Sequence, residues 1–377
     1  MKKKICFVVA IPGTAQSFLR DHIAALSSDY DVYLVGNIKD RKDVIGFSLT
    51  GWHQVRIERG ISLMYDLAAV WKLYRYFSKM KFDAVHSVTP KAGLVCAVAS
   101  WLARIKHRTH IFTGQVWATR TGAMRRLLKL MDHIIVSCDN HILVDGRSQR
   151  SFLIEEKILR EGQAEVFHKG SISGVNIERF APDTNIREQI RREIGIGYNV
   201  LTYIFLGRLN HDKGIGELFD AYNRLAGEAD DVFLLLVGYD EENYISQLPL
   251  FPNIVEGKNF HYYGLTPHPE KVLNAGDVFV LPTYREGFGT SVLEAACIGL
   301  PCICSDAYGV LDAYTPETGL QCHVGDADSL YKCMKEMYEH PGKVKEMGEK
   351  SRNRVLEDFD AKVLTGCWVD FYHDILE

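Results

Sequence analysis

The stretch Asp277-Val-Phe-Val-Leu-Pro-Thr-Tyr-Arg-Glu-Gly-Phe-Gly-Thr-Ser-Val-Leu-Glu294 predicts one repeat of a parallel α/β sheet. Residues 277–282 read as a buried strand, and the glycine turn after them leads into a helix. This order places the carboxylates of Glu286 and Glu294 along one side of the element. Acid groups placed in this way can accept hydrogen bonds from sugar hydroxyls.

The start of this helix is also suited to an anion. The amides of residues 287–290 have no partner within the helix, and the two glycines allow an anion to come close to them. The hydroxyls of Thr290 and Ser291 could add phosphate contacts. The segment therefore suits a sugar that is joined to a phosphate.

A second segment has the same strand-and-turn pattern. Residues 201–206 read as a buried strand that runs into Gly207-Arg208-Leu-Asn-His-Asp-Lys213-Gly214 and then a helix. Arg208 brings an always-charged guanidinium fork and Lys213 a flexible ammonium. Both charges become more favourable as negative charge develops on a departing diphosphate. We therefore assign Arg208, Lys213 and Glu286 as candidate catalytic residues.

Together the two segments resemble the retaining glycosyltransferases of family 4, which carry Gly-Arg-Leu-x3-Lys-Gly and, about 70 residues later, Glu-x7-Glu. The resemblance covers nearly the whole chain. It implies the GT-B fold, an α/β architecture in which two Rossmann-like, doubly wound parallel-sheet domains face each other across a cleft. It also implies that the acceptor attacks from the leaving-group side and that the diphosphate itself takes the proton.

The resemblance also implies a role for each residue of the donor site. Arg208 and Lys213 would hold the diphosphate, and Glu294 would accept hydrogen bonds from the ribose hydroxyls. Glu286 would orient the transferred sugar, together with the amides of the glycine turn. The full set of expected donor-binding residues is Gly207, Gly238, Tyr263, Gly264, Leu265, Gly287, Phe288, Gly289, Thr290, Ser291 and Glu294.

The length of 377 residues suits two domains of ordinary size. We expect an acceptor-binding domain over 1–175 and a donor-binding domain over 176–359, with a last helix at about 360–377 that packs back on the first. Strand patterns alternate with helical ones, as in parallel doubly wound sheets. The expected strands are 5–10, 32–35, 84–87, 110–113, 134–137 and 165–169 in the first half, and 201–206, 233–237, 260–263, 278–281 and 302–305 in the second.

Ligands of such sheets bind beyond the carboxyl ends of the strands, so the turns of the first domain are candidate acceptor or phosphate sites. These turns contribute Gly13, Thr14, Ser87, Thr89, Lys91, Thr113, Gly114 and Gln115. The alternatives are an ordinary tight turn at Gly13 and a capped helix with a surface lysine at Lys91. Many family members have a histidine where this chain has Thr113. This chain therefore has no histidine that could act as a base at that position.

The third of these turns, which contains Thr113-Gly114-Gln115, and its neighbour His86-Ser-Val-Thr-Pro-Lys-Ala-Gly93 resemble one branch of the family. That branch builds capsular polysaccharide, O-antigen and bacterial N-glycan precursors on polyprenyl pyrophosphate. The resemblance implies a hexosyl- or N-acetylhexosaminyltransferase whose donor is a nucleotide sugar, most simply a UDP-sugar. It implies a lipid-linked saccharide as acceptor, with the pyrophosphate head of that lipid on the first domain.

Charge is distributed unevenly along the chain, although the net charge is only −4. Residues 1–175 carry a net +11 and residues 176–377 a net −15. Basic residues of the first half lie among Trp, Tyr, Leu and Met at 71–81, 101–108 and 120–129, a composition typical of segments at an anionic membrane surface. Solvated helix faces are the alternative, which charge reversal at Arg125, Arg126 and Lys129 would test. Nothing else in the sequence supports nucleic acid as the partner.

No segment has the length of a membrane span or of a signal-peptide core, and the nine cysteines suggest no disulfide framework. We therefore expect a cytoplasmic protein, peripherally associated with the inner face of the membrane. We expect no cofactor and no metal, because Asp326-Ala-Asp328 reads as a helix N-cap and the histidines form no ligand pattern. Two alternative functions remain: a nucleotide-sugar 2-epimerase of the same architecture and a non-catalytic sugar-nucleotide-binding protein.

Overall fold

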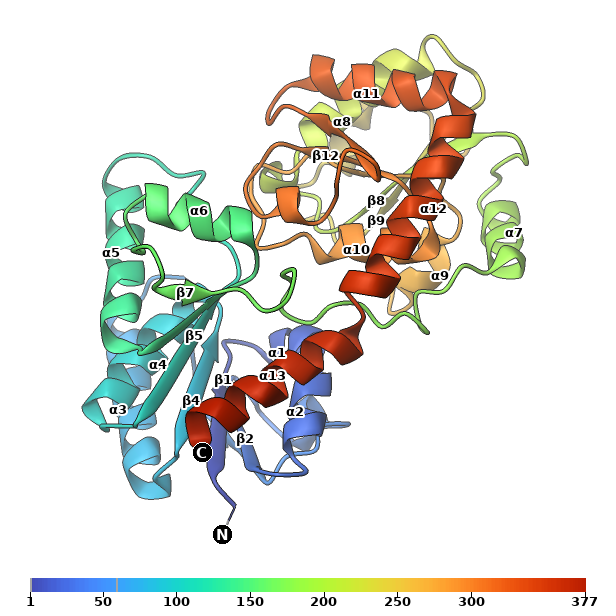
Figure 1. Ribbon diagram of the computed structural model, residues 1–377. Coiled ribbons are helices and arrows are strands. Elements are labelled where there is room, and N and C mark those ends of the chain that lie inside the picture. The colour runs from blue at the N-terminus through green and yellow to red at the C-terminus, as the bar shows by residue number, and fades with distance from the viewer. Residues whose placement is uncertain (1, 59) are drawn as a thin grey trace. The chain divides into compact units, whose positions relative to one another are not determined.

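The computed structural model describes residues 2–58 and 60–377, and the chain forms two compact units (Figure 1). The first unit contains Met1–Ser173 together with Ala361–Glu377, and the second contains Gly174–Asp360. Each unit is built on one parallel sheet with helices on both faces. The boundary between the units is close to the one expected at 175/176.

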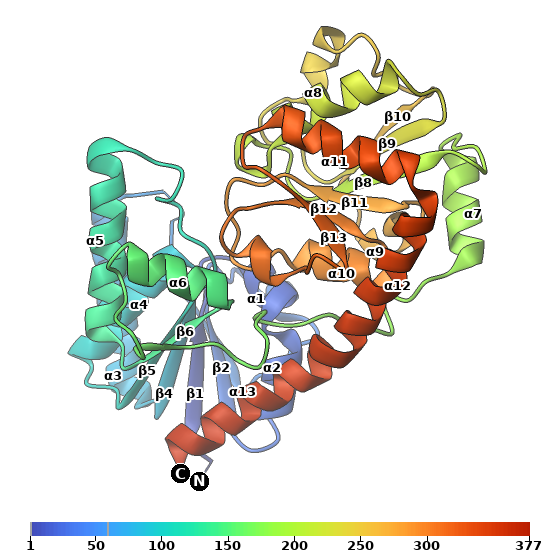
Figure 2. The ribbon, with the colours of Figure 1, turned by 45° about the horizontal axis from the view of Figure 1, so that its top comes forward.

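The sheet of the first unit has the order β3-β2-β1-β4-β5-β6-β7. Its strands are β1 (Lys4–Val8), β2 (Asp31–Gly36), β3 (Gly51–Gln54), β4 (Ala84–Val88), β5 (His107–Phe112), β6 (His141–Val144) and β7 (Ala164–Glu165). Its helices are α1 (Pro12–Phe18), α2 (Arg20–Leu26), α3 (Leu63–Met80), α4 (Pro90–Leu102), α5 (Gly122–Cys138), α6 (Arg147–Glu155) and α13 (Ala361–Leu376), with a 3-10 turn η1 (Arg41–Val44). Helices α3, α4 and α5 lie side by side on one face, and α2 packs with α13 on the other (Figure 2).

The C-terminal helix α13 is held on the first unit by stacked aromatic rings. Trp368 lies between His22 and His86, at ring distances of 4.5 and 4.7 Å, and its Nε1 donates to the carbonyl of Ile172. Burial lowers the pKa of His22 to about 4, so this ring is neutral at pH 7, and its nitrogens lie 3.0 Å from the Thr365 hydroxyl and 2.9 Å from the carbonyl of Ile172. The last segment of the chain therefore belongs to the core of the first unit.

The sheet of the second unit has the order β10-β9-β8-β11-β12-β13. Its strands are β8 (Leu201–Leu206), β9 (Val232–Val237), β10 (Phe260–Gly264), β11 (Val278–Leu281), β12 (Cys302–Ser305) and β13 (Gly319–Cys322). Its helices are α7 (Thr184–Glu193), α8 (Ile215–Ala226), α9 (Pro269–Leu273), α10 (Thr290–Ile298), α11 (Ala327–Glu339) and α12 (Pro341–Asp358), with 3-10 turns η2 (His211–Lys213), η3 (Ile245–Leu250) and η4 (Val310–Asp312). The central strands β8 and β11 are neighbours, so the turns that follow them lie at the same edge.

One strand prediction is wrong, and the strand expected at 165–169 is reduced to the two-residue β7 (Ala164–Glu165), with residues 166–169 outside any strand. Residues 134–137 were expected to form a strand because they are apolar and partly β-branched, but they form the last turns of α5. In that helix Asp132 and Ile135 are buried together, three residues apart, and this helical period outweighs the strand propensity. The strand of this region is β6, which begins at His141, and the sequence did not indicate β6, β3 or β13.

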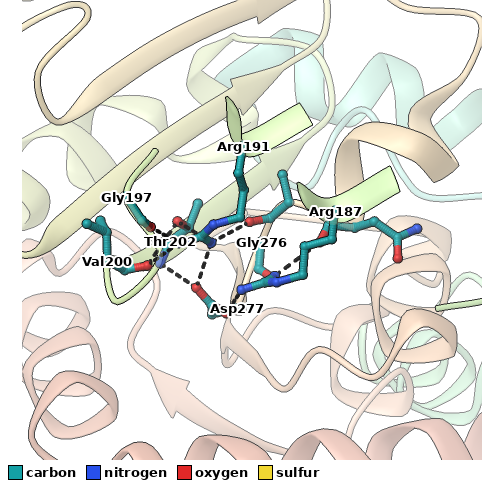
Figure 3. A network of polar contacts seen from close by, with 9 residues as sticks. Arg187, Arg191, Gly197, Val200, Thr202, Gly276 and Asp277 are labelled. Carbon is teal, nitrogen blue, oxygen red and sulfur yellow. Dashed lines mark hydrogen bonds and ion pairs between the residues drawn. The ribbon is translucent and has the colours of Figure 1, made fainter. Parts of the chain in front are cut away.

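A partly buried carboxylate ties α7 to the amino ends of β8 and β11 (Figure 3). Asp277 accepts from Arg187 at 2.6 Å, from Arg191 at 3.3 Å and from the backbone N–H of Thr202 at 2.8 Å. The Arg191 side chain is almost fully buried, and its guanidinium also donates to the carbonyls of Gly197, Val200 and Ala275. Every charge of this network thus has partners, as burial requires.

Candidate active site

The turns that follow β8 and β11 are joined by hydrogen bonds. The carbonyl of Asp212 accepts from the Thr283 hydroxyl and from the backbone N–H of Tyr284, both at 2.8 Å. The Asp212 carboxylate forms an ion pair with Arg285 at 2.6 Å. These contacts bring the Gly-Arg-Leu-x3-Lys-Gly segment and the Glu-x7-Glu segment into one site.

Lys213 and Glu286 meet at the centre of this site. The Lys213 ammonium donates to the Glu286 carboxylate, and only 19% and 13% of the two side chains are exposed. The following residue has to be glycine: Gly214 has φ +72°, and a Cβ there would lie 2.1 Å from the carbonyl oxygen of Pro282. Lys213, which is assigned to the diphosphate, and Glu286, which is assigned to the sugar, thus contact each other directly.

Arg208 also has an acidic partner, which the sequence analysis did not identify. Its Nη1 donates to both carboxylate oxygens of Glu241, at 2.9 and 2.7 Å. Glu241 lies in the turn after β9, at the same edge of the sheet as Arg208. The acidic triplet Asp240-Glu241-Glu242 directly after a strand pattern was the signal that could have indicated it.

The turns after β8, β9 and β10 pack closely at this edge. Gly238 has φ +140°, and a Cβ there would lie 1.8 Å from the carbonyl oxygen of Gly207, so only glycine fits. The Gly238 N–H donates to the carbonyl of Gly264 at 2.9 Å, and the Tyr262 hydroxyl donates to the carbonyl of Gly238 at 2.9 Å. Gly207, Gly238 and Gly264, expected at the donor, thus lie together, and Tyr262 is an additional residue that holds them.

Two further residues of the expected donor site, Tyr263 and Leu265, remain accessible beside these glycines. Leu265 is 79% exposed, and Tyr263 is partly exposed. An apolar side chain that protrudes from a turn at this edge can lie against the face of a base.

Helix α10 begins at the glycine turn, with Gly289 as N-cap at φ +88°. Glu294 lies four residues after Thr290, about one helical turn inside α10. Burial raises the pKa of the Glu294 carboxyl to about 7, with a smaller opposing effect of Arg179. Thr290 and Ser291 are partly exposed in the first turn of the helix.

Phe288 can contribute only backbone contacts to a ligand. Its side chain is 2% exposed and lies 5.5 Å from the ring of Phe359 in the core of the second unit. Gly309 packs closely against the backbone of the turn that carries Glu286. A Cβ at position 309 would lie 2.4 Å from the carbonyl oxygen of Glu286. The turn that carries Glu286 is therefore supported from both sides.

In the first unit the expected acceptor residues are not all at the surface. Ser87 is fully buried in β4, and its hydroxyl is 2.9 Å from His110 Nδ1, so the expected contact of Ser87 with an anion is not supported. Thr89 precedes α4 with φ +78°, a strained value for a β-branched residue. Gly13 and Thr14 lie in the first turn of α1, where Gly13 is exposed.

The charge of Lys91 is already paired. Its ammonium lies 2.5 Å from the carboxylate of Asp66 on α3, and both side chains are largely buried. Gln115 is 1% exposed, and its Oε1 accepts from Gln149 Nε2 at 3.4 Å. In the third turn Gly114 is buried and Thr113 is partly exposed. Lys91 and Gln115 thus stabilise the turns of the first unit, and sequence reasoning did not find their partners.

Within residues 2–58 and 60–377, no group of three or more His, Cys, Asp or Glu side chains could hold a metal ion. Asp326 is the N-cap of α11, where its Oδ1 accepts from the backbone N–H of Ser329 at 2.9 Å. The interpretation of the Asp326-Ala-Asp328 segment as a helix cap is confirmed.

Comparison with known proteins relates both units to one class of enzyme. Residues 19–170 match the model of a glycosyl transferase 4-like domain, and residues 186–354 match that of glycosyl transferases group 1. The capsular polysaccharide biosynthesis glycosyltransferase CapM of Staphylococcus aureus is 27% identical, over 100% of this chain and 99% of that protein. An Escherichia coli UDP-Gal:alpha-D-GlcNAc-diphosphoundecaprenol alpha-1,3-galactosyltransferase is 24% identical, over 100% and 98%.

Among solved structures, Anabaena Alr3699/HepE in complex with UDP and glucose has the same fold. The TM-score is 0.82, at 17% sequence identity, and the similarity covers 99% of this chain and 100% of that one. The similarity extends over both parallel sheets.

Proposed function

Because the chain belongs to the glycosyltransferases that combine a 4-like domain with a group 1 domain in two Rossmann-like folds, we propose that it transfers a sugar from a UDP-sugar to a lipid-linked saccharide, with retention of configuration. The product would be a precursor of capsule or another surface polysaccharide. The observation that carries this proposal is the pairing of Lys213 with Glu286 in a site that also contains Arg208. UDP as the nucleotide is supported by the name of the Escherichia coli relative and by the UDP in the Anabaena structure.

In the proposed reaction the bond between the anomeric carbon and the diphosphate oxygen breaks, and a bond to the acceptor hydroxyl forms on the same face. The hydroxyl proton passes to the departing diphosphate. Arg208 and Lys213 stabilise the charge that develops on that leaving group, and they do so best in a site with little water. Glu286 holds Lys213 in place while the site is empty and accepts hydrogen bonds from the sugar when it is filled.

An assay with a panel of nucleotide sugars, with and without polyprenyl-pyrophosphate-linked acceptors, tests this function. Mass spectrometry should show an acceptor enlarged by one sugar and the release of UDP. An isomerised donor without any acceptor would instead establish the epimerase alternative. A donor that binds and stays unchanged with every acceptor would favour a non-catalytic sugar-nucleotide-binding protein.

Glu294→Gln should weaken the binding of uridine and UDP, whereas Glu286→Gln should mainly lower the rate of transfer. The reason is position: Glu286 contacts Lys213 at the reacting end, and Glu294 lies one turn inside α10. Isothermal titration with uridine and UDP and a transfer assay on both variants measure the difference. Equal losses of UDP affinity would show that the two roles are wrongly assigned.

The carboxyl of Glu294 should also make the binding of the nucleoside depend on pH. With a pKa of about 7 in the empty site, Glu294 loses its charge as the pH falls below 7 and becomes a poorer acceptor for ribose hydroxyls. Uridine affinity should therefore fall severalfold between pH 8 and pH 6 in the native protein and stay level in Glu294→Gln. Uridine is the suitable probe because it has no phosphate that titrates in this range.

We further propose that transfer needs no metal ion. The support for this proposal is that Arg208, Lys213 and the glycine-opened start of α10 lie at the same edge of the sheet, and we expect these donors to bind the diphosphate. EDTA should accordingly leave the rate unchanged, with a Mg²⁺-supplemented reaction as the control. A loss of activity that Mg²⁺ or Mn²⁺ restores would contradict the proposal.

An anionic membrane surface is the proposed partner of the first unit. No helix of the described chain is long and apolar enough to cross a bilayer. The outward side of α3 nevertheless exposes Met64, Leu67 and Trp71, at 83%, 61% and 60%, followed by the exposed cations Lys72, Arg75 and Lys79. An amphipathic helix of this composition is typical of attachment to the membrane interface.

The two helices beside α3 continue the same surface. Helix α4 exposes Trp101 and Leu102 near its end, and α5 exposes Leu127 and Leu130. Neither of the two carboxylates on these three helices is exposed, because Asp66 pairs with Lys91 and Asp132 is buried against Trp117. This α3–α5 surface therefore presents apolar and cationic groups without an acidic side chain.

Two of the cations that the sequence suggested for a charge-reversal test, Arg125 and Lys129, are poorly suited to such a test. Arg125 and Lys129 both pair with Glu156, at 2.7 and 2.8 Å, and both lie over the ring of Trp117. Reversing their charges would leave Glu156 without its partners and disturb α5 and α6. A charge effect on the membrane is better measured on α3.

The triple variant Lys72→Glu, Arg75→Glu, Lys79→Glu should bind anionic vesicles about 100-fold more weakly, since each basic residue near such a surface contributes about 1 kcal/mol. Co-sedimentation with phosphatidylglycerol vesicles measures this, and added salt should weaken binding of the native protein. A control with reversed charges at Arg192, Lys345 and Lys350 of the second unit should bind as the native protein does. Unchanged binding of the α3 variant would contradict the membrane role.

A further inference from the structure

The guanidinium of Arg208 is held at one end only. Its two contacts among the described residues both run from Nη1 to Glu241, at 2.9 and 2.7 Å. The Nε and Nη2 groups, on the opposite edge of the fork, have no contact in this part of the chain. That edge offers two parallel N–H donors, the arrangement that binds a phosphate in a bidentate manner.

Glu241 is itself held by a buried residue. The Asn210 side chain, which is 5% exposed, donates from Nδ2 to Glu241 Oε2 at 2.7 Å. A carboxylate can only accept, so the amide nitrogen of Asn210 must be the atom that faces it. The carboxylate therefore has one fixed neighbour on the protein side and one cation on the open side.

The backbone beneath Glu241 is also fixed. The N–H of Leu209 donates to the carbonyl of Tyr239 at 2.8 Å, and the N–H of Glu241 donates to the carbonyl of Leu209 at 3.1 Å. The carboxylate of Asp240 accepts from the N–H groups of Tyr244 and Ile245, at 2.9 and 3.0 Å. The turn after β9 is thus an extension of the sheet, and Glu241 cannot readily move away from Arg208.

We propose that Glu241 is a positioning residue for the donor diphosphate, an inference that rests on the proposed function. It fixes Arg208 through Nη1, so that the Nε and Nη2 edge faces the phosphates before the donor arrives. A half-exposed arginine has many rotamers, and restricting them in advance lowers the entropy lost on binding. The alternative, in which Glu241 competes with phosphate for Arg208, predicts the opposite change in affinity.

Titration calorimetry with UDP and with uridine tests the proposal on Glu241→Gln and Glu241→Ala. Both variants should bind UDP about 5- to 10-fold more weakly, the usual effect of freeing one such side chain, and should bind uridine as the native protein does. Glu228→Ala is the matched control, because it removes a comparably exposed pair with Lys335 that is also 2.7 Å long. The glutamine variant keeps the shape of the side chain while it removes the charge and one acceptor oxygen, and it is therefore expected to fold.

The same measurement in an Arg208→Ala background shows whether Glu241 acts through Arg208. In that background the Glu241 substitutions should have no further effect on UDP affinity. Tighter UDP binding, an equal loss for uridine, or a loss that persists without Arg208 would each overturn the positioning role. If Arg208→Ala alone leaves UDP affinity unchanged, the donor site of the proposed function is wrong as well, which separates the two failures.

Discussion

Lys213→Ala should lower turnover by about 100- to 1000-fold while the protein remains folded, the usual loss when one donor to a developing negative charge is removed. The ammonium of Lys213 lies in a largely buried pair with Glu286, where an electrostatic contact is stronger than in water. Arg208→Ala should lower turnover by a similar factor, with a larger share of the effect in donor binding because Arg208 is half exposed. Steady-state kinetics with the identified donor and acceptor measure both.

The pairing of Lys213 also requires a control, because its removal leaves Glu286 without its cation. If the rate loss came only from that unpaired carboxylate, the double variant Lys213→Ala, Glu286→Gln would be as active as Glu286→Gln alone. We expect it to remain as slow as Lys213→Ala or slower. Lys335→Ala, at an exposed pair of the same unit, should keep native activity. A folded Lys213→Ala variant within a factor of two of the native rate would exclude Lys213 from the site.

Asp277→Ala should lower the free energy of unfolding of the second unit by about 3–5 kcal/mol, because it leaves two arginines of a partly buried network without their carboxylate. Arg191 suffers most, since its side chain is almost fully buried and burial already lowers the pKa of its guanidinium. Urea denaturation of the full chain, followed by circular dichroism, measures the change.

The matched control for this prediction is Glu346→Ala. It removes an exposed pair between neighbouring turns of α12, where Glu346 and Lys350 are 2.7 Å apart. Such a pair contributes about 0.3–0.5 kcal/mol. Equal effects of the two substitutions would show that the Asp277 network is no more important than a surface pair.

Local patterns were sufficient for most of the donor site. A strand that is buried on both faces is a continuous apolar run, and the strands 278–281 and 302–305 were predicted with the bounds that the structure has. The turns after such strands share one edge of a parallel sheet, so Arg208, Lys213 and Glu286 could be placed in one site before their contacts were known. Strand β6 is equally short, but it was missed because the apolar residues 134–137 of α5, just before it in the chain, have a similar composition.

The sequence by itself determined the alternation of strands and helices, the glycine turns and the identity of the charged residues at the donor site, because each depends on neighbouring residues along the chain. Only the tertiary structure decided the partners of those charges: Glu241 for Arg208, Asp66 for Lys91, and Glu156 for Arg125 and Lys129. It also decided that Ser87 is buried, since its neighbour His110 comes from the adjacent strand. Such contacts join residues that are 23 to 33 positions apart, and the packing of whole elements sets their distance.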